Sequence, residues 1–207
     1  VMVKAPEFGN VQDAAAYYTE RGFRVIPLYG VDSSGRCNCP KFDCKDRDAG
    51  KHTAPETEEA WKAGQRFEPW AFPLGSNIAL AMGPWRRDRW LVALDLDGTS
   101  NPADFFPSLP ATLTAETPRG GRHLVFSVRE RAPLGNWVDV FKTKSAGFSL
   151  DLRYARGRIV VAPSRGAEGQ YRWIDWREPA PLPEAAISSI LAMREQLGLP
   201  VSEAWDR

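Results

Sequence analysis

The stretch RWLVALDLDG (residues 89–98) constrains the fold most strongly, because it sets two aspartates into an apolar run typical of a buried strand. Side chains alternate between the two faces of a strand, so Asp95 and Asp97 share one face. Leu94 and Leu96 share the other face. With a rise of about 3.3 Å per residue, the two aspartates lie roughly 6.6 Å apart along the strand. The strand therefore needs a core against one face, and both carboxylates on the other face can converge on divalent cations.

A second stretch, FSLDLRY (residues 148–154), repeats this pattern. Asp151 and Arg153 share one face of a predicted strand, and the two leucines beside them share the other. Clustered carboxylates repel one another by several kcal/mol at about 4 Å, so bringing them together usually requires a cation. Paired divalent ions about 3.5 to 4 Å apart are the usual solution where phosphoryl groups are transferred. The two strands together predict a metal-binding site formed by Asp95, Asp97 and Asp151.

A third motif, TPRGGRHLVF (residues 117–126), lies between the two acidic strands in the sequence. Gly120 and Gly121 allow unusual dihedral angles or a close approach of the backbone to a ligand. Arg119 and His123 supply cationic or donor groups that suit a triphosphate. A hairpin turn beside a solvated histidine explains the same residues, and the acidic strand of residues 89–98 can likewise end in a plain turn.

All three cysteines of the chain fall in CNCPKFDCKDRDAGKH (residues 37–52), with the spacing Cys-x-Cys-x4-Cys-x7-His. An odd number of cysteines within such a short segment makes a poor disulfide framework. Three thiolates and one imidazole are, however, a complete tetrahedral zinc set, formed here by Cys37, Cys39, Cys44 and His52. Because such a set leaves no open position for water, the metal is expected to hold the loop and not to take part in chemistry. Free surface cysteines in a polar loop are the alternative.

Composition sets few further limits. At 207 residues the chain is long enough for one large domain or two small ones. The net charge is only +1, so any nucleic-acid surface must be a local basic patch. No stretch approaches the roughly 20 apolar residues of a membrane span and no secretory signal opens the chain, which makes cytosolic residence the expectation.

The remaining patterns predict an α+β fold with two closely packed lobes, a helix and strand module followed by a mostly antiparallel sheet. Helices are expected over 11–22, 57–65 and 184–197, the first capped by Asn10. Strands are expected over 23–30, 77–83, 90–97, 111–118, 122–128, 148–154, 157–164 and 170–176. The strands over 77–83 and 90–97 are expected to be neighbours, joined by a basic turn.

Four motifs carry a resemblance, in this order along the chain: the cysteine-rich segment, ALDLDG, TPRGGRHLVF and DLRYARGRIVVAPS. The chain resembles the primase-polymerase domain at the N-terminus of bifunctional DNA primase/polymerases of plasmids and phages, in the archaeo-eukaryotic primase superfamily. The resemblance covers roughly residues 10–180. It implies an RRM-like catalytic sheet, a catalytic domain over 1–183 with a zinc-binding loop at 37–52, and a C-terminal helix with the start of a linker over 184–207.

The resemblance also implies residue roles. The acidic pair of the family's first motif falls on Asp95 and Asp97, and the third-motif carboxylate on Asp151; these positions bind the catalytic Mg²⁺ or Mn²⁺ ions. The family's Ser-x-His motif places a histidine on the phosphates of the incoming nucleotide, and that role falls on His123. Gly121 stands at the serine position, so backbone N–H groups of Gly120 and Gly121 are expected to substitute for the hydroxyl.

Three further residues are assigned on position and charge. Arg119 and Arg153 are added as phosphate ligands, and Ser164 is either a nucleotide contact or a plain strand end. The zinc loop matches a cysteine and histidine insertion seen in this family.

The function expected from these motifs is a template-directed DNA primase and DNA polymerase, working by two-metal nucleotidyl transfer from nucleoside triphosphates. Three other classes stay open. A metal-dependent nuclease or phosphohydrolase would use the same carboxylates. A non-catalytic zinc-containing nucleic-acid-binding module would explain the cysteines but not the acidic faces. A sheet domain could also serve as a structural adaptor for a helicase.

The expected partners follow from that function. They are a single-stranded DNA template, dNTPs or NTPs, and a helicase domain in the same polypeptide, with no membrane contact, a monomeric state and a cytoplasmic location in a bacterial or archaeal cell. The basic, aromatic stretches PWRRDRW (84–90) and VFKTKSAGF (140–148) could follow a template backbone and stack bases, or could be solvated turns.

Overall fold

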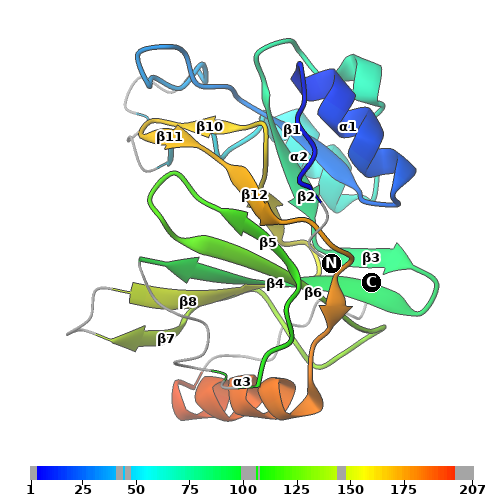
Figure 1. The fold of residues 1–207 in the computed structure, drawn as a ribbon, viewed down its shortest axis with the longest axis vertical. Helices are drawn as coiled ribbons and strands as arrows, with labels where there is room; N and C mark the ends of the chain where they lie inside the picture. The colour runs from blue at the N-terminus through cyan, green and yellow to red at the C-terminus, as the bar shows by residue number, and fades with distance from the viewer. Residues whose placement is uncertain are drawn as a thin grey trace.

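Two sheets, a short hairpin and three α-helices form the fold of the described residues (Figure 1). The computed structural model describes residues 4–40, 44, 48–98, 106, 108–143 and 148–198. The prediction of an α+β fold with a mostly antiparallel sheet is confirmed. Among the described strands only β13 (Ala180–Pro181) pairs in parallel, with β6 (Arg122–Arg129).

The smaller sheet has the strand order β1, β2, β9. Its strands are β1 (Val25–Leu28), β2 (Asn77–Ala81) and β9 (Arg158–Val160). The larger sheet has the order β12, β5, β6, β4, β8, β7, with β13 added beside β6 and β3 beside β4. Its other strands are β3 (Gly83–Arg86), β4 (Arg89–Asp97), β5 (Leu113–Glu116), β7 (Trp137–Thr143), β8 (Phe148–Arg153) and β12 (Arg172–Asp175). A separate hairpin joins β10 (Arg165–Gly166) to β11 (Gly169–Gln170).

The helices follow their local signals. α1 (Val11–Glu20) begins where predicted, because the Asn10 side chain accepts a hydrogen bond of 2.9 Å from the backbone N–H of Asp13. α2 (Pro55–Lys62) begins two residues before the expected Thr57. Proline is preorganised for a first helical turn, which explains the earlier start. α3 (Glu184–Gln196) lies close to its predicted bounds, and the 3₁₀ turn η2 (Pro69–Ala71) packs beside α1.

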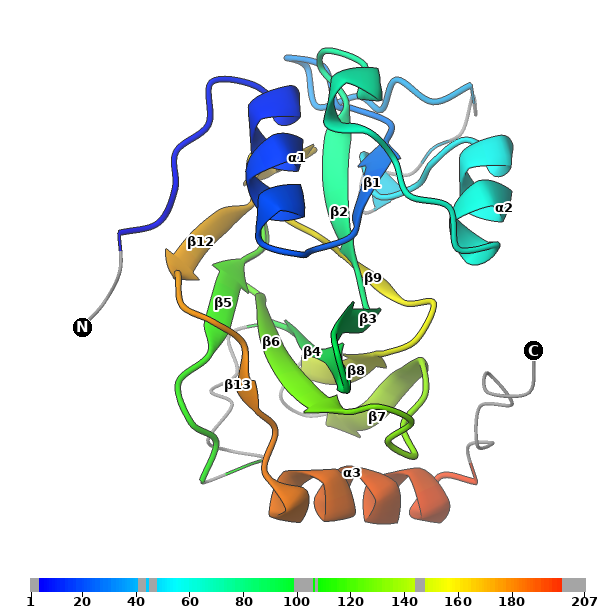
Figure 2. The same cartoon turned by 90° about the vertical axis from the view of Figure 1, so that its right-hand side faces the viewer.

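Apolar residues fill the space on both sides of the larger sheet. Figure 2 shows α3 beneath this sheet, at the far end of the molecule from α1 and α2. The predicted apolar face of β4 is confirmed: Leu94 and Leu96 are buried in one cluster with Ile190 of α3. The opposite face of the sheet packs against α1 and the smaller sheet, and Leu91 and Tyr18 are buried there. Burying each large apolar side chain stabilises the fold by about 1.5 to 3 kcal/mol.

One predicted connection is wrong. The strands over 77–83 and 90–97 are not neighbours, because β2 pairs with β1 and β9 whereas β4 pairs with β3, β6 and β8. The stretch interpreted as a turn contains β3, which forms a hairpin with the start of β4. Gly83 explains the difference, since its φ of 109° lets the chain leave the smaller sheet and enter the larger one.

Both sheets contribute to the core around Tyr18, while the division into two lobes, the RRM-like topology and the boundary at residue 183 stay predictions. The predicted linker over 199–207 lies outside the described residues. No helix in the described part of the chain is both long enough and apolar enough to span a bilayer.

Candidate active site

Three neighbouring strands place a row of polar side chains across the larger sheet. In the β4–β6 pairing Asp95 lies opposite His123, and in the β4–β8 pairing Asp95 lies opposite Asp151. Directly opposed residues of antiparallel strands project from the same face, so His123, Asp95 and Asp151 form one line. This face is the one opposite Leu94 and Leu96. The predicted convergence of the two acidic strands is therefore built into the register of the sheet.

Short polar contacts connect this row. The Nε2 atom of His123 lies 3.2 Å from Oδ1 of Asp95. The Nη2 atom of Arg153 lies 2.6 Å from Oδ2 of Asp151 and 3.5 Å from Oδ2 of Asp95. The backbone N–H of Asp139 donates to Oδ1 of Asp151 at 2.7 Å. The two carboxylates thus share one guanidinium, which offsets their mutual repulsion.

The two facing carboxyl groups respond differently to their surroundings. Burial disfavours the charge of Asp95, but His123, Arg153 and Lys51 outweigh it and lower the pKa of Asp95. Burial also disfavours the charge of Asp151, and the nearby carboxylates add to that effect. The pKa of Asp151 is raised because the Asp139 N–H and Arg153 do not fully compensate. A divalent cation would therefore favour ionised Asp151 in particular.

A cleft of about 1000 Å³ opens over this row. The predicted Asp95, Asp97 and Asp151 all line it, and Asp97 is the exposed member of the three. The other predicted residues in its wall are His123, Arg119 and Arg153. Segments from both sheets, the zinc loop, α2 and the β10–β11 hairpin complete the lining.

The glycine pair shapes a turn beside this cleft. The N–H of Gly120 donates to the carbonyl of Thr117 at 3.0 Å, and the N–H of Thr117 donates to the carbonyl of Gly121 at 2.9 Å. This pattern is a three-residue hairpin loop whose last position needs a positive φ, and Gly120 has a φ of 77°. A Cβ atom on Gly121 would lie only 2.4 Å from the carbonyl oxygen of Leu96. Neither glycine is part of the cleft wall, and the N–H of Gly120 is committed to the turn.

Arg119 lies in this turn and lines the cleft, where it forms an ion pair with Glu168. Nη2 of Arg119 lies 2.8 Å from Oε1 of Glu168, which belongs to the loop between β10 and β11. Both side chains are about half exposed, with relative exposures of 47% and 50%. This ion pair joins two walls of the cleft.

Ser164 has a different place. It is buried and outside the cleft wall. Its hydroxyl accepts from the N–H of Ile78 at 2.8 Å and lies 3.0 Å from the carbonyl oxygen of Ile78. Of the two roles left open for this serine, these contacts favour a strand end that closes the smaller sheet.

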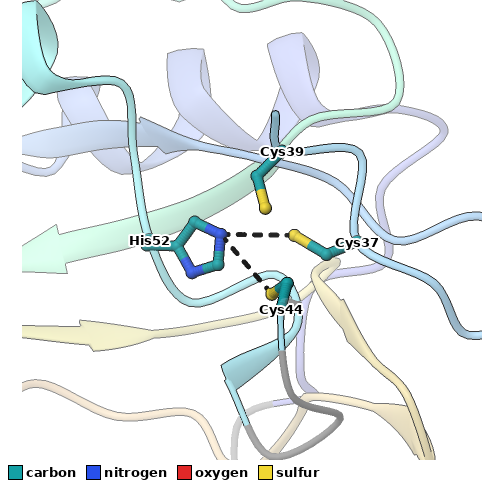
Figure 3. A group of neighbouring side chains, drawn as sticks. All are labelled: Cys37, Cys39, Cys44 and His52. Carbon is teal, nitrogen blue, oxygen red and sulfur yellow. Dashed lines mark hydrogen bonds between the residues drawn. The ribbon is translucent and has the colours of Figure 1, made fainter. Parts of the chain in front are cut away.

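A second cluster of side chains lies in the loop before α2. Figure 3 shows Cys37, Cys39, Cys44 and His52 converging, and their ligand atoms all lie within 4.8 Å of one another. The distance to Nε2 of His52 is 3.4 Å from Sγ of Cys37 and 3.7 Å from Sγ of Cys44. In a tetrahedral zinc site a sulfur and a nitrogen ligand are about 3.6 Å apart. The predicted ligand set therefore fits a structural zinc site.

The thiols of this cluster also influence one another's protonation. Burial, followed by the neighbouring thiols of Cys39 and Cys37, raises the pKa of Cys44 to about 12. Without a metal this thiol stays protonated at neutral pH. A bound metal reverses the balance, because thiolates are the form that ligates.

A comparison with protein-family models matches residues 15–185 to bifunctional DNA primase/polymerase, N-terminal (Prim-Pol). The chain belongs to the Prim-Pol family. The resemblance drawn from the four motifs is thereby confirmed, and the match contains every residue predicted for the acidic, nucleotide and zinc sites. A search of curated proteins finds no match.

Several residues in the Prim-Pol cleft were not singled out from the sequence. Lys51 and Glu168 line the cleft from loops, and the backbone of Asp139 holds Asp151. Tyr171 stacks on His123, with ring centroids 5.9 Å apart and an interplanar angle of 29°. Burial raises the pKa of the Tyr171 phenol and keeps it neutral. Loop residues show no periodicity that could place them over a strand, although AGKH marks Lys51 as the neighbour of the predicted zinc ligand His52.

The two stretches expected to contact a template lie in different places. Residues 84–90 form the β3–β4 hairpin, at the opposite end of β4 from Asp97 and more than about 20 Å away along the strand. In this hairpin the Trp85 ring stacks on Phe23, and Arg86 pairs with Glu178 at 2.7 Å. Residues 144–147 of the second stretch lie outside the described residues. A template contact at either stretch stays a prediction.

Proposed function

We propose that this Prim-Pol chain is a template-directed DNA primase and DNA polymerase that uses nucleoside triphosphates on a single-stranded DNA template. The observation that carries the proposal is the row of His123, Asp95 and Asp151 on three adjacent strands beneath the cleft. Membership of the family supports the reaction class. A cleft of about 1000 Å³ is large enough for a nucleotide with its metal ions.

Asp95, Asp97 and Asp151 would hold two Mg²⁺ or Mn²⁺ ions, because hard cations prefer carboxylate oxygens. Bound there, the ions would lower the pKa of the attacking 3′-hydroxyl and stabilise the pyrophosphate leaving group. The ionisation of these groups supports the assignment. The pKa of Asp95 is already lowered, and the raised pKa of Asp151 belongs to a carboxylate whose charge is incompletely compensated.

Arg153 would change partners during the cycle. Without metal it contacts both Asp95 and Asp151 and limits their repulsion. With cations on these carboxylates, its guanidinium would be free to contact the triphosphate, whose oxygens match its planar donor geometry. Arg119, which also lines the cleft, would contact the same phosphates.

His123 would position phosphate by hydrogen bonding and not by acid–base chemistry. Its Nδ1 atom is buried and has no hydrogen-bond partner among the described residues. Buried polar atoms nearly always have a partner, so the orphaned atom supports a ligand at this position. The contact with Asp95 and the stack on Tyr171 fix the ring for this role.

Labelled-nucleotide incorporation on single-stranded DNA, with Mg²⁺ or Mn²⁺, tests the proposal. We expect wild-type protein to make labelled product and the Asp95→Ala/Asp97→Ala variant to lose it by about a thousandfold or more, because the metal site is dismantled. Asp175→Ala is the matched control, since Asp175 lies on β12 of the same sheet and pairs with Arg177 outside the cleft.

Equal incorporation by wild type and the double variant would overturn the mechanism. Degradation of the DNA without incorporation would identify a metal-dependent nuclease that uses the same carboxylates. DNA binding with neither reaction, unaffected by loss of the aspartates, would identify a non-catalytic zinc module.

A further inference from the structure

Lys51 brings a positive charge from the zinc loop into the cleft. It lies directly before the zinc ligand His52, and it lines the cleft together with Asp95. Its charge acts on the Asp95 carboxylate. The loop therefore reaches the acidic row although zinc itself has no open position for chemistry.

Within the described residues Lys51 forms no ion pair, although its charge acts on Asp95. Four other cations of the cleft wall contact carboxylates: Lys62 and Arg158 with Glu58, Arg119 with Glu168, and Arg153 with Asp151. In the part of the chain that the structure describes, Arg156 of the same wall is likewise without an ion-pair partner, and of the two cations Lys51 is the one whose charge acts on Asp95. An exposed, unpaired ammonium beside three carboxylates and their cations is suited to an anionic ligand.

The backbone on both sides of Lys51 is fixed. The N–H of Gly50 lies 3.4 Å from Sγ of the zinc ligand Cys37, and the carbonyl of Gly50 accepts from the side chain of Asn77 at 3.0 Å. On the other side, the carbonyl of His52 accepts from the N–H of Tyr29 at 2.9 Å. Gly50 has a φ of 75°, and an added Cβ would lie 2.3 Å from the Asn77 amide nitrogen.

Asn77 connects the backbone beside Lys51 to another wall of the cleft. It is buried, and its side chain also accepts from the N–H of Arg165 at 3.0 Å and donates to the Arg165 carbonyl at 2.6 Å. Arg165 begins the β10–β11 hairpin whose loop contains Glu168. The zinc cluster is thus joined by hydrogen bonds to two segments that line the cleft.

We propose that Lys51 is a ligand for the β- and γ-phosphates of the incoming nucleotide, and that the zinc cluster holds it in position over the acidic strands. This proposal rests on the proposed nucleotidyl transfer and names a further phosphate ligand for the same site. Lysine acts on phosphate as a compact point charge, so its effect depends on where the backbone places it. In this chain the zinc loop determines that place.

Equilibrium binding of a non-hydrolysable nucleoside triphosphate with Mg²⁺ tests the role of Lys51. We expect Lys51→Ala to weaken triphosphate binding about tenfold, as the loss of one charge-assisted contact does, and Lys51→Arg to restore part of it. Binding of a nucleoside monophosphate should not change. Zinc content and the unfolding temperature should equal those of wild type, because Lys51 is exposed.

Arg36→Ala is the matched control. It removes a positive charge directly before the zinc loop, but the side chain is 83% exposed and outside the cleft. Triphosphate affinity unchanged by Lys51→Ala, or weakened equally by Arg36→Ala, would overturn the role of Lys51. A wild-type protein that binds no triphosphate at all would instead overturn the proposed function.

Removal of zinc with a chelator tests the second half of the proposal. We expect zinc removal to weaken triphosphate binding in wild type, and to weaken it less in Lys51→Ala, because the two changes act through one contact. Equal losses in both proteins would show that zinc does not act through Lys51. Circular dichroism before and after chelation distinguishes a local change from unfolding of the whole chain.

Discussion

Asp95 and Asp151 face each other across the β4–β8 pairing, yet their pKa values move in opposite directions. Burial opposes the charge of both. Asp95 gains more from His123, Arg153 and Lys51 than burial removes, so its pKa falls. Asp151 keeps the N–H of Asp139 and the guanidinium of Arg153, but its pKa rises. The charged form of Asp95 is therefore favoured before a metal binds. The charged form of Asp151 is disfavoured, and a bound cation would favour it.

This asymmetry predicts the pH dependence of Mn²⁺ binding. A proton and a cation compete for Asp151, and the competition begins at a pH above the ordinary carboxyl value of 3.8 because the pKa of Asp151 is raised. We expect Mn²⁺ affinity, measured by calorimetric titration, to fall as the pH is lowered from neutrality towards that pKa. Asp151→Asn should bind Mn²⁺ more weakly and lose this part of the pH profile. An unchanged profile in the variant would assign the proton to another group.

The same asymmetry predicts opposite effects on stability without added Mg²⁺ or Mn²⁺, with zinc retained. The lowered pKa of Asp95 means that its charge stabilises the fold above the unfolded value, and that this stability is lost as pH falls through the lowered pKa. The raised pKa of Asp151 means that stability is lost as pH rises through it. At neutral pH we therefore expect Asp95→Asn to lower the unfolding temperature. Asp151→Asn should leave it equal or raise it.

Added Mn²⁺ provides the control for this comparison. It should raise the unfolding temperature of wild type by mass action and have little effect on either variant. If Asp151→Asn destabilised the metal-free protein as much as Asp95→Asn does, this result would contradict the opposite pKa shifts of the two carboxyl groups.

Local rules predicted the two faces of β4, because the alternation of leucine and aspartate depends only on the strand period. They also predicted the match with Asp151, since the same alternation recurs there. The pairing of the strands could not be predicted in the same way. A positive φ at Gly83 directs the chain into another sheet, and no residue pattern indicates this change. The contributions of Lys51 and Tyr171 depend on loops and long-range packing, which carry no periodic signal.

The turn glycine gives a further test. The resemblance predicts that Gly121 stands at the serine position of the family's motif, but a Cβ atom there would lie 2.4 Å from the Leu96 carbonyl oxygen. We expect Gly121→Ser to destabilise the chain by about 1 to 3 kcal/mol in urea unfolding and not to improve nucleotide binding. Gly9→Ser on the exposed N-terminal segment is the control, and it should cost much less. A stable Gly121→Ser protein with tighter triphosphate binding would show that the β5–β6 turn can shift to admit the hydroxyl.

The hydrogen bonds of Asn77 predict that zinc binding and folding are linked. Its buried amide satisfies the Gly50 carbonyl on one side and both backbone groups of Arg165 on the other. Asn77→Ala leaves the carbonyl of the buried Gly50 without this partner, at about 1 to 3 kcal/mol, and also removes the part-buried bonds to Arg165. We expect a lower unfolding temperature and weaker zinc retention in competition with a chelating dye. Ser189→Ala, which removes an exposed hydroxyl on α3, should change neither measurement.

The ion pair between Arg119 and Glu168 predicts a variant that binds triphosphate more tightly. Their ion pair is half exposed, so it contributes at most about 1 kcal/mol to the stability of the fold. A triphosphate that binds Arg119 must nevertheless displace the Glu168 carboxylate and tolerate its negative charge nearby. Glu168→Gln removes both obstacles, and we expect triphosphate binding to tighten by a few fold in low salt, whereas Arg119→Ala weakens it. In Arg119→Ala protein the added Glu168→Gln change should give a smaller gain, because the two residues act on one contact. An equal gain in affinity in wild-type and Arg119→Ala protein would instead indicate a general effect of negative charge in the cleft. Rising salt would then remove that gain equally from the two proteins.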